Sequence, residues 1–358
     1  MLLRPLELRC GVTLPNRVAL AALTNMQSQV DGLLGSDELA FLARRAEGGF
    51  GTITTCATYV AADGKGWDGE LGIDRDACIP GLTTLTARVR EAGAIALVQL
   101  FHGGARADPA LIGEQPWSAS AWTDGKLAPR AATPDDIARV IDQFIAGAMR
   151  AKTAGFAGVE LHGAHGYLLS QFLSTTMNTR TDEWGGSLAN RARLIRTIAQ
   201  RTRAACGSRF VVGVRLSLED FAQARGLDLD DSLEVARRLA DDGVDYIHAS
   251  LWDVARMTAK RPDAHALPLL RAALPADVAT IVAGKIWSRD DGERMLGLGA
   301  DVIALGRSAI VNPDWPRTVA AGEIPRRPPL TRAELGDRAV SPRFAEYLSQ
   351  WKNFVAPE

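Results

Sequence analysis

Two imidazoles and a phenol lie close together in one short segment of the chain. His162, His165 and Tyr167 fall within six positions, directly after an apolar run that ends at His162. Imidazole N–H groups can hold a carbonyl oxygen, and a phenol can deliver a proton. The alternative, that they are structural residues with satisfied hydrogen bonds, is more plausible for any one of the three than for all of them together. The segment therefore predicts a site that binds a carbonyl compound and protonates it.

Metal binding is the other chemistry that a pair of histidines can perform. Zinc and iron require further ligands, and the sequence suggests no third ligand near His162 and His165. The four cysteines form no C-x-x-C pair, which argues against a zinc ribbon, an iron–sulfur cluster and a disulfide scaffold. We therefore expect no metal, and the cysteine usage fits a reducing cytoplasm best.

Arg215 places a charge inside a strand that is otherwise nearly apolar, VVGVRL at residues 211–216. Burial of an unpaired charge is costly, so the guanidinium requires an anionic partner. That partner is either a ligand or an internal carboxylate such as Glu160, and the position of Arg215 alone does not favour one over the other.

A second arginine follows a glycine at the end of another buried strand. Residues 300–308, ADVIALGRS, lead from an apolar run into the turn Gly306-Arg307, and Ala283-Gly284 ends the preceding run. In barrels of alternating strands and helices, the loops after strands seven and eight commonly bind phosphate through backbone N–H groups. With Arg307 nearby, these turns predict a phosphate site. The alternative is an ordinary glycine turn with a surface arginine.

The elements that must position these residues alternate along the chain. Short apolar runs rich in β-branched residues alternate with longer stretches of period 3.6, as is typical of βα units with a parallel sheet. Eight such runs occupy residues 18–23, 51–55, 95–100, 158–162, 210–216, 244–248, 278–284 and 301–305. Eight units predict a closed (β/α)₈ barrel, a TIM barrel of the α/β class, and a doubly wound open sheet is the competing arrangement.

Helix signals support this alternation. Thr133-Pro134-Asp135-Asp136 combines an N-cap residue with an early proline and an acid at the third position. Ser187 and Ser288 are expected to begin two further helices, and Gly155, Gly243 and Gly299 mark the return to the next strand. The open sheet would favour a G-x-G-x-x-G motif after an early strand, and the sequence contains none.

The whole chain, residues 1–358, is predicted to form a single barrel domain. Residues 103–133 interrupt it after the third strand and are expected to form an inserted lid or hairpin. Residues 330–358 form a C-terminal tail, which either reaches a neighbouring subunit's active site or packs on its own barrel. A homodimer is slightly favoured.

The charge balance excludes several classes of partner. Lys and Arg number 41 against 42 Asp and Glu, which gives no global attraction to nucleic acid or to an anionic membrane. Apolar runs stay shorter than the roughly 18 residues that a membrane span requires, and the N-terminus does not read as a signal peptide. We therefore expect a small-molecule substrate, without a nucleic acid or membrane partner.

Residues 162–174, HGAHGYLLSQFLS, and residues 178–191, NTRTDEWGGSLANR, form one long and specific pattern. This pattern strongly resembles the Old Yellow Enzyme family of flavin-dependent ene-reductases. The resemblance extends to LPNRV at 14–18, VQLFH at 98–102, PWSASA at 116–121 and Gly306-Arg307, so that it covers most of the chain. It implies a barrel with noncovalent FMN at its C-terminal mouth and NADPH or NADH as the reductant.

Motif matching then implies roles for individual residues. The flavin ring would be surrounded by Ala22, Leu23, Thr24, Ala57 and Gln99, with Arg215 at its N1–O2 edge. Its phosphate would be held by Gly284, Gly306 and Arg307, and Ala283 would be a further cofactor-binding residue. His162 and His165 match the pair that binds the substrate carbonyl, Tyr167 matches the proton donor, and Met26 is expected at the substrate face. The implied activity is NAD(P)H-dependent reduction of the C=C bond of α,β-unsaturated carbonyl compounds.

Three other functions compete with this hypothesis. A relative of trimethylamine dehydrogenase or dienoyl-CoA reductase would add a cysteine cluster and further nucleotide-binding domains. A lyase or isomerase barrel acting on a phosphorylated metabolite would require a catalytic lysine or carboxylate at a strand end, where only Lys285 is available. A flavin enzyme reducing uridine in RNA would favour a basic surface or an added RNA-binding domain.

Overall fold

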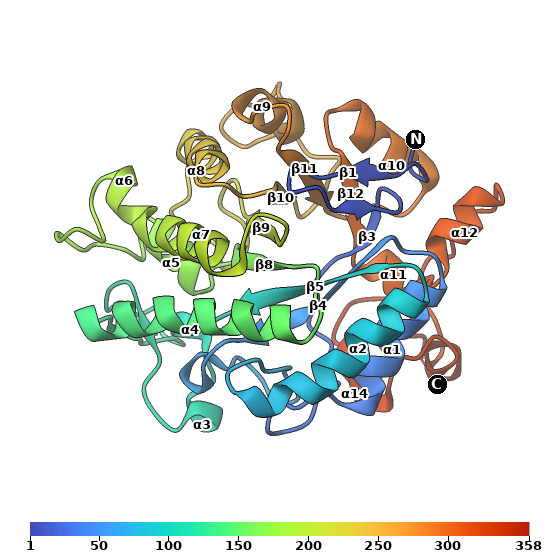
Figure 1. The fold of residues 1–358 in the computed structure, drawn as a ribbon, viewed down its shortest axis with the longest axis horizontal. Coiled ribbons are helices and arrows are strands. Elements are labelled where there is room, and N and C mark those ends of the chain that lie inside the picture. The colour runs from blue at the N-terminus through green and yellow to red at the C-terminus, as the bar shows by residue number, and fades with distance from the viewer. Residues whose placement is uncertain (358) are drawn as a thin grey trace.

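Eight parallel strands pair into a closed barrel in the computed structural model, which describes residues 1–357 (Figure 1). They are β3 (Val18–Leu20), β4 (Thr52–Tyr59), β5 (Ile95–Phe101), β8 (Gly158–Gly163), β9 (Val211–Leu216), β10 (Tyr246–Ser250), β11 (Ala279–Ala283) and β12 (Val302–Leu305). The last strand, β12, pairs with the first, β3, through Ile303 and Val18, which closes the ring. The predicted (β/α)₈ barrel is confirmed, and the open-sheet alternative is wrong.

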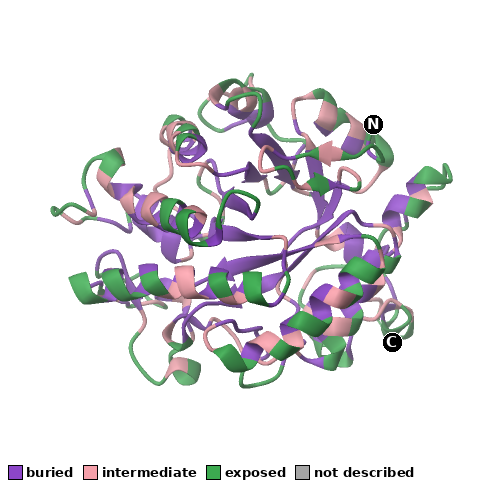
Figure 2. Cartoon of the chain, in the orientation of Figure 1, coloured by how far each residue is buried: buried purple, intermediate pink, exposed green. Residues whose placement is uncertain are grey.

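Helices surround the barrel and bury one side against it, as the alternation of buried and exposed segments along each helix shows (Figure 2). The longer ones are α1 (Ser36–Glu47), α2 (Ile79–Glu91), α4 (Pro134–Thr153), α7 (Arg193–Cys206), α8 (Leu229–Asp241), α9 (Ala266–Ala273), α10 (Arg289–Gly297) and α14 (Pro342–Ser349). The shorter ones are α3 (Pro109–Ile112), α5 (Leu168–Leu173), α6 (Leu188–Arg191), α11 (Arg307–Val311), α12 (Trp315–Ala320) and α13 (Arg332–Gly336).

Helices begin at the three predicted N-cap residues. Thr133 and Asp136 form a reciprocal capping box at α4, and Ser288 and Asp291 form another at α10. Ser187 caps α6 by accepting the N–H of Asn190. The single helix predicted to begin at Ser187 is divided into α6 and α7, because Ala192 forms a turn between them.

The segment after β5 was expected to form an inserted lid or a hairpin, and it is not a hairpin. Its strands β6 (Trp117–Ser118) and β7 (Arg130–Ala131) pair in parallel, which two strands joined by a tight turn cannot do. Contacts from elsewhere in the chain hold the segment: Trp117 Nε1 donates to Asp63 at 3.1 Å, and Arg180 Nη1 donates to the carbonyl oxygens of Ala119 and Ala132 at 2.9 and 2.7 Å. Its geometry therefore depends on distant residues and not on a local turn.

An antiparallel pair of strands, which was not predicted, closes the N-terminal end of the barrel. It consists of β1 (Leu6–Glu7) and β2 (Thr13–Leu14). Leu8 and Leu14 are both 2% exposed and pack with Tyr246 and other barrel-interior residues. The cavity of the molecule that accepts a ligand is therefore expected at the opposite end, where the strands end.

The C-terminal tail packs on its own barrel, which was one of its two expected positions. Phe344 of α14 meets Phe41 of α1 edge to face at 5.6 Å, and the backbone N–H of Ser341 donates to Gln27 Oε1 at 2.9 Å. The chain end is held by a backbone hydrogen bond from Leu330 to the carbonyl of Phe354. Within residues 1–357, no helix has both the length and the apolar character needed to cross a membrane.

Candidate active site

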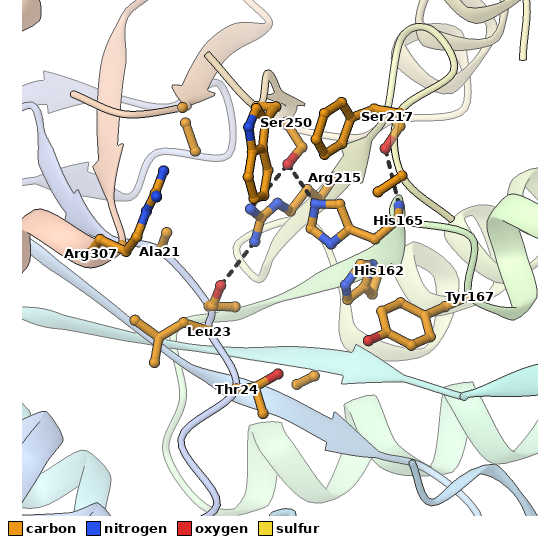
Figure 3. Close-up of a pocket in the computed structure, with 18 of the residues that line it drawn as sticks. Ala21, Leu23, Thr24, His162, His165, Tyr167, Arg215, Ser217, Ser250 and Arg307 are labelled. Carbon is orange, nitrogen blue, oxygen red and sulfur yellow. Dashed lines mark hydrogen bonds between the residues drawn. The ribbon is translucent and has the colours of Figure 1, made fainter. Parts of the chain in front are cut away.

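A cavity of about 390 Å³ opens where the barrel strands end, the position at which (β/α)₈ enzymes place their active sites (Figure 3). Its volume lies within the usual range for small-molecule sites. Thirteen of the fourteen residues predicted for the site line it: Ala22, Leu23, Thr24, Ala57, Gln99, His162, His165, Tyr167, Arg215, Ala283, Gly284, Gly306 and Arg307. Met26 is the exception among the described residues, and its carbonyl instead packs against Gly69.

Arg215 lies at the floor of this cavity, and neutral groups hold it. Nη1 donates to the carbonyl oxygen of Ala22 at 3.0 Å, and Nη2 donates to Ser250 Oγ at 3.1 Å. Its Nε is buried without a hydrogen-bond partner in the part of the chain that the structure describes. Burial lowers the pKa of Arg215, and the charge of Glu160 opposes that shift.

Glu160, the internal acid that could have paired with Arg215, is bound to other groups. One oxygen accepts from Gln99 Nε2 at 2.7 Å, and the other meets Tyr246 Oη at 3.1 Å and His248 Nδ1 at 2.8 Å. Burial alone would raise the pKa of Glu160, but His248 and Arg215 outweigh it and lower this pKa to about 2. No direct ion pair between Arg215 and an acid occurs among residues 1–357, so the salt-bridge alternative is wrong. The guanidinium remains available to an anionic ligand.

His162 presents an N–H to the cavity. It is 4% exposed, and its Nδ1 accepts the backbone N–H of Ala164 at 3.3 Å. A neutral imidazole carries one N–H, so Nε2 bears the hydrogen and is the donor. Burial, with the charge of Arg215, lowers the pKa of His162 to about 3. The ring is therefore neutral at physiological pH.

The ring of His165 faces that of His162, with the two ring centroids 5.0 Å apart and an angle of 83° between the ring planes. Its Nε2 lies 2.7 Å from the Ser250 hydroxyl, which already accepts from Arg215 and so has its own hydrogen to donate. This arrangement favours a neutral ring with its hydrogen on Nδ1. Burial lowers the pKa of His165 well below its usual value. The backbone is fixed in the left-handed region, φ 61°, with its N–H donating to Ser217 Oγ at 3.0 Å.

Tyr167 completes the group on the same side of the cavity (Figure 3). Its ring centroid lies 5.1 Å from that of His162 and 4.6 Å from that of Phe101. Burial raises the pKa of Tyr167, and the charge of Arg106 opposes the shift. Its hydroxyl therefore keeps its proton at neutral pH and can donate it.

The opposite side of the cavity carries Arg307, the residue predicted to hold phosphate (Figure 3). Its guanidinium carbon lies 5.4 Å from the ring centroid of Trp252 and 5.3 Å from that of Trp351. Burial lowers the pKa of Arg307, and the charge of Asp253 opposes that shift. Asp253 itself accepts a hydrogen bond from Lys285 Nζ at 2.9 Å. That ion pair also leaves Lys285 poorly placed as a catalytic base, which weakens the lyase alternative.

Glycine is required at the neighbouring strand end. A Cβ on Gly284 would lie 1.8 Å from the carbonyl oxygen of Leu251, and its φ is 153°. At Gly306 a Cβ would meet nothing within 4 Å, so that turn faces open space. Within residues 1–357, neither Arg215 nor Arg307 forms an ion pair with an acid. Two such arginines at opposite ends of one cavity, beside an open glycine turn, fit a nucleotide with a charged ring edge and a phosphate.

Several lining residues were not predicted: Trp67, Arg106, Ser217, Phe221, Ser250, Trp252, Tyr347 and Trp351. Ser217 directly follows β9 and Ser250 ends β10, so the strand-end rule could have identified both. Tyr347 and Trp351 come from the C-terminal tail, which was expected to contribute to an active site only as one of two alternatives, and then to that of a neighbouring subunit.

Comparisons with known proteins show the family to which the chain belongs. The sequence profile of the NADH:flavin oxidoreductase / NADH oxidase family matches residues 1–324. The probable NADH-dependent flavin oxidoreductase YqiG of Bacillus subtilis is 35% identical over 330 residues, covering 90% of this chain and 88% of that protein. The NADH:fumarate oxidoreductase of Klebsiella pneumoniae is 35% identical over 335 residues, covering 90% of this chain, which spans only 36% of that longer protein.

Solved structures give the same result. The old yellow enzyme homologue from Zymomonas mobilis superposes with a TM-score of 0.82 at 27% identity, covering 96% of this chain and 98% of that chain. The resemblance read from residues 162–191 is confirmed. The chain belongs to the NADH:flavin oxidoreductase / NADH oxidase family, the family of the Old Yellow Enzymes, whose members are NAD(P)H-dependent oxidoreductases with noncovalent FMN.

Proposed function

We propose that this protein is an FMN-dependent NAD(P)H ene-reductase, which reduces the C=C bond of α,β-unsaturated carbonyl compounds. The observation that carries the proposal is one cavity lined by two neutral imidazoles, a protonated phenol and Arg215. Within residues 1–357, this arginine forms no ion pair with an acidic side chain. Donors for an oxygen, a proton source and a fixed cation are what such a reduction requires of the protein.

The cofactor would be held along the whole cavity floor. When bound, FMN accepts a hydride from the nicotinamide and passes it to the alkene. Arg215 would stabilise the negative charge at the N1–O2 edge, and Gln99, fixed by Glu160, would contact the same ring. Arg307 and the turns at Gly284 and Gly306 would hold the phosphate.

The substrate would be activated by the two histidines. His162 Nε2–H and His165 Nδ1–H would donate to its carbonyl oxygen and stabilise the enolate-like charge that develops as hydride reaches the β-carbon. Each preorganised donor of this kind contributes roughly 3 kcal/mol to the transition state. Tyr167 would then donate its phenolic proton to the α-carbon. NADH and NADPH would use the same flavin face as the alkene.

The direct test is cofactor content and turnover. The purified protein is expected to be yellow and to release FMN on denaturation. Anaerobic NADPH or NADH should bleach the flavin, and 2-cyclohexenone should restore its colour with formation of cyclohexanone. A colourless protein that does not bind added FMN would overturn the proposal.

Replacement of Arg215 by methionine tests the fixed cation. We expect the rate of flavin reduction by NADPH or NADH to fall about 100-fold, because one buried charged donor to a developing anion is lost. Anaerobic stopped-flow absorbance measures this rate. Arg209→Met, at an exposed arginine just before β9, is the matched control and should leave it unchanged. Flavin reduction at the wild-type rate in Arg215→Met would contradict the role of Arg215.

A further inference from the structure

Arg106 occupies the substrate side of the cavity in a fixed position. It ends a short 3₁₀ helix, Gly104–Arg106, that follows β5. Its Nη1 donates to the carbonyl oxygen of His165 at 2.8 Å, and its guanidinium carbon lies 4.1 Å from the ring centroid of Tyr167. The turn itself is held by the backbone N–H of Ala105, which donates to Gln171 Oε1 at 3.1 Å. The charge is therefore placed beside the proposed proton donor by contacts on both sides.

The cavity contains one cation more than the cofactor uses. The Arg and Lys side chains that line it are Arg106, Arg215, Lys285 and Arg307. None of its lining residues in the described range 1–357 is Asp or Glu. Lys285 is bound to Asp253. Under the proposed function, Arg215 serves the flavin edge and Arg307 serves the phosphate. Arg106 is left with a carbonyl oxygen and a ring face as its contacts, and no ion pair of it occurs within the described chain.

We propose that Arg106 binds a carboxylate of the substrate, so that the natural substrates are enones or related alkenes that carry an anionic group near the reacting bond. This inference rests on the proposed function and names the substrate class of the same site. A guanidinium presents a planar set of donors that matches a carboxylate, and such charge-assisted bonds are strong where water is scarce.

The placement of Arg106 decides between two sources of negative charge. The phosphates of the nicotinamide coenzyme are the other anions that visit this cavity. Arg106, however, packs on Tyr167 and binds the backbone of His165, and both of these residues contact the reacting part of the alkene under the proposed function. Arg106 is therefore better placed to bind an anionic group on the alkene than a phosphate of the coenzyme.

The test compares a charged alkene with its neutral ester, and it rests on how the acid-to-ester ratio changes between enzymes, because the ester is also the more electron-poor alkene. (E)-4-oxopent-2-enoate carries a ketone and a carboxylate on one double bond, and its methyl ester is the neutral match. The holoenzyme is expected to reduce the acid with a higher kcat/KM than the ester. Arg106→Gln should lower kcat/KM for the acid more than for the ester, by a further factor on the order of 10 to 100, as expected for loss of a charged hydrogen bond. The ester should lose only what Arg106 contributes by holding Tyr167 and His165. Arg106→Lys keeps the charge and should retain part of the preference.

Binding gives a readout that does not depend on turnover. The saturated acid 4-oxopentanoate and its methyl ester can be titrated against the flavin absorbance of the oxidised holoenzyme. The dissociation constant of the acid should rise in Arg106→Gln by the same factor as its kcat/KM falls, while that of the ester stays the same. Thermal unfolding of each variant checks that the fold is retained.

Three results would overturn the inference. Equal losses for acid and ester would mean that Arg106 only positions Tyr167 and His165. A raised KM for NADPH or NADH, with an unchanged acid-to-ester ratio, would mean that Arg106 binds coenzyme phosphate. A dissociation constant of 4-oxopentanoate that stays unchanged in Arg106→Gln would exclude a carboxylate site. Failure of the proposed function is distinct from all three, because it shows as a protein that does not bind FMN.

Discussion

Replacement of both His162 and His165 by alanine is expected to lower kcat/KM for an enone on the order of 10⁴-fold, since each lost donor to a developing oxyanion costs about 10²-fold or more. FMN should remain bound. The histidines are neutral because burial lowers the pKa of both, so their removal leaves the charges at Arg215 and Arg307 unchanged. Binding of a phenol to the oxidised enzyme should weaken together with alkene reduction.

A third histidine provides the matched control for this double variant. His265 caps α9 by accepting the N–H of Leu267 on Nδ1, and it does not line the cavity in the structure of residues 1–357. His265→Ala should lower the melting temperature through loss of the cap and leave enone reduction unchanged. If the double variant instead lost FMN as completely as it lost activity, the two histidines would be structural supports of the flavin site and not donors to the substrate.

The barrel could be predicted because its strands are buried on both faces. A parallel strand covered by helices on one side and by the barrel interior on the other is apolar throughout, as VVGVRL of β9 is, and such runs are visible without any knowledge of their partners. Helix starts were equally local, since Thr133 and Asp136 satisfy each other within one turn. The parallel pairing of Trp117 with Arg130 was not predictable, because Asp63 and Arg180 hold that segment from far along the chain.

The candidate site was predictable to the extent that it lies at strand ends. His162, Arg215 and Ala283 each fall at the end of a strand that the sequence already indicated, and the barrel geometry brings those ends together. Met26 does not follow this rule: it lies beyond the end of β3 with its backbone in the left-handed region, φ 53°, and within residues 1–357 it is not among the residues that line the cavity. Arg106 lies in the short 3₁₀ helix after β5 and Tyr347 lies in α14 of the tail, and the positions of both elements depend on tertiary packing.

Replacement of Tyr167 by phenylalanine is expected to slow alkene reduction about 10³-fold, within the range of general acid catalysis, and to leave flavin reduction by NADPH or NADH within about twofold of wild type. Phenylalanine keeps the ring that packs against Phe101 and His162, so only the proton donor is lost. The two half-reactions are separated by anaerobic stopped-flow absorbance, first with the nicotinamide and then with an enone added to the reduced enzyme.

The pH profile identifies the phenol as the acid. Burial raises the pKa of Tyr167 above its usual value of about 10, so the protonated form is present throughout the neutral range and is lost only as the pH rises through that raised pKa. Alkene reduction by the wild type should therefore be level across neutral pH and fall at strongly alkaline pH, and Tyr167→Phe should lose the alkaline fall along with the rate. A slow variant that kept the fall would assign it to another group, and equal losses in both half-reactions would mean that Tyr167 shapes the flavin site and does not donate the proton.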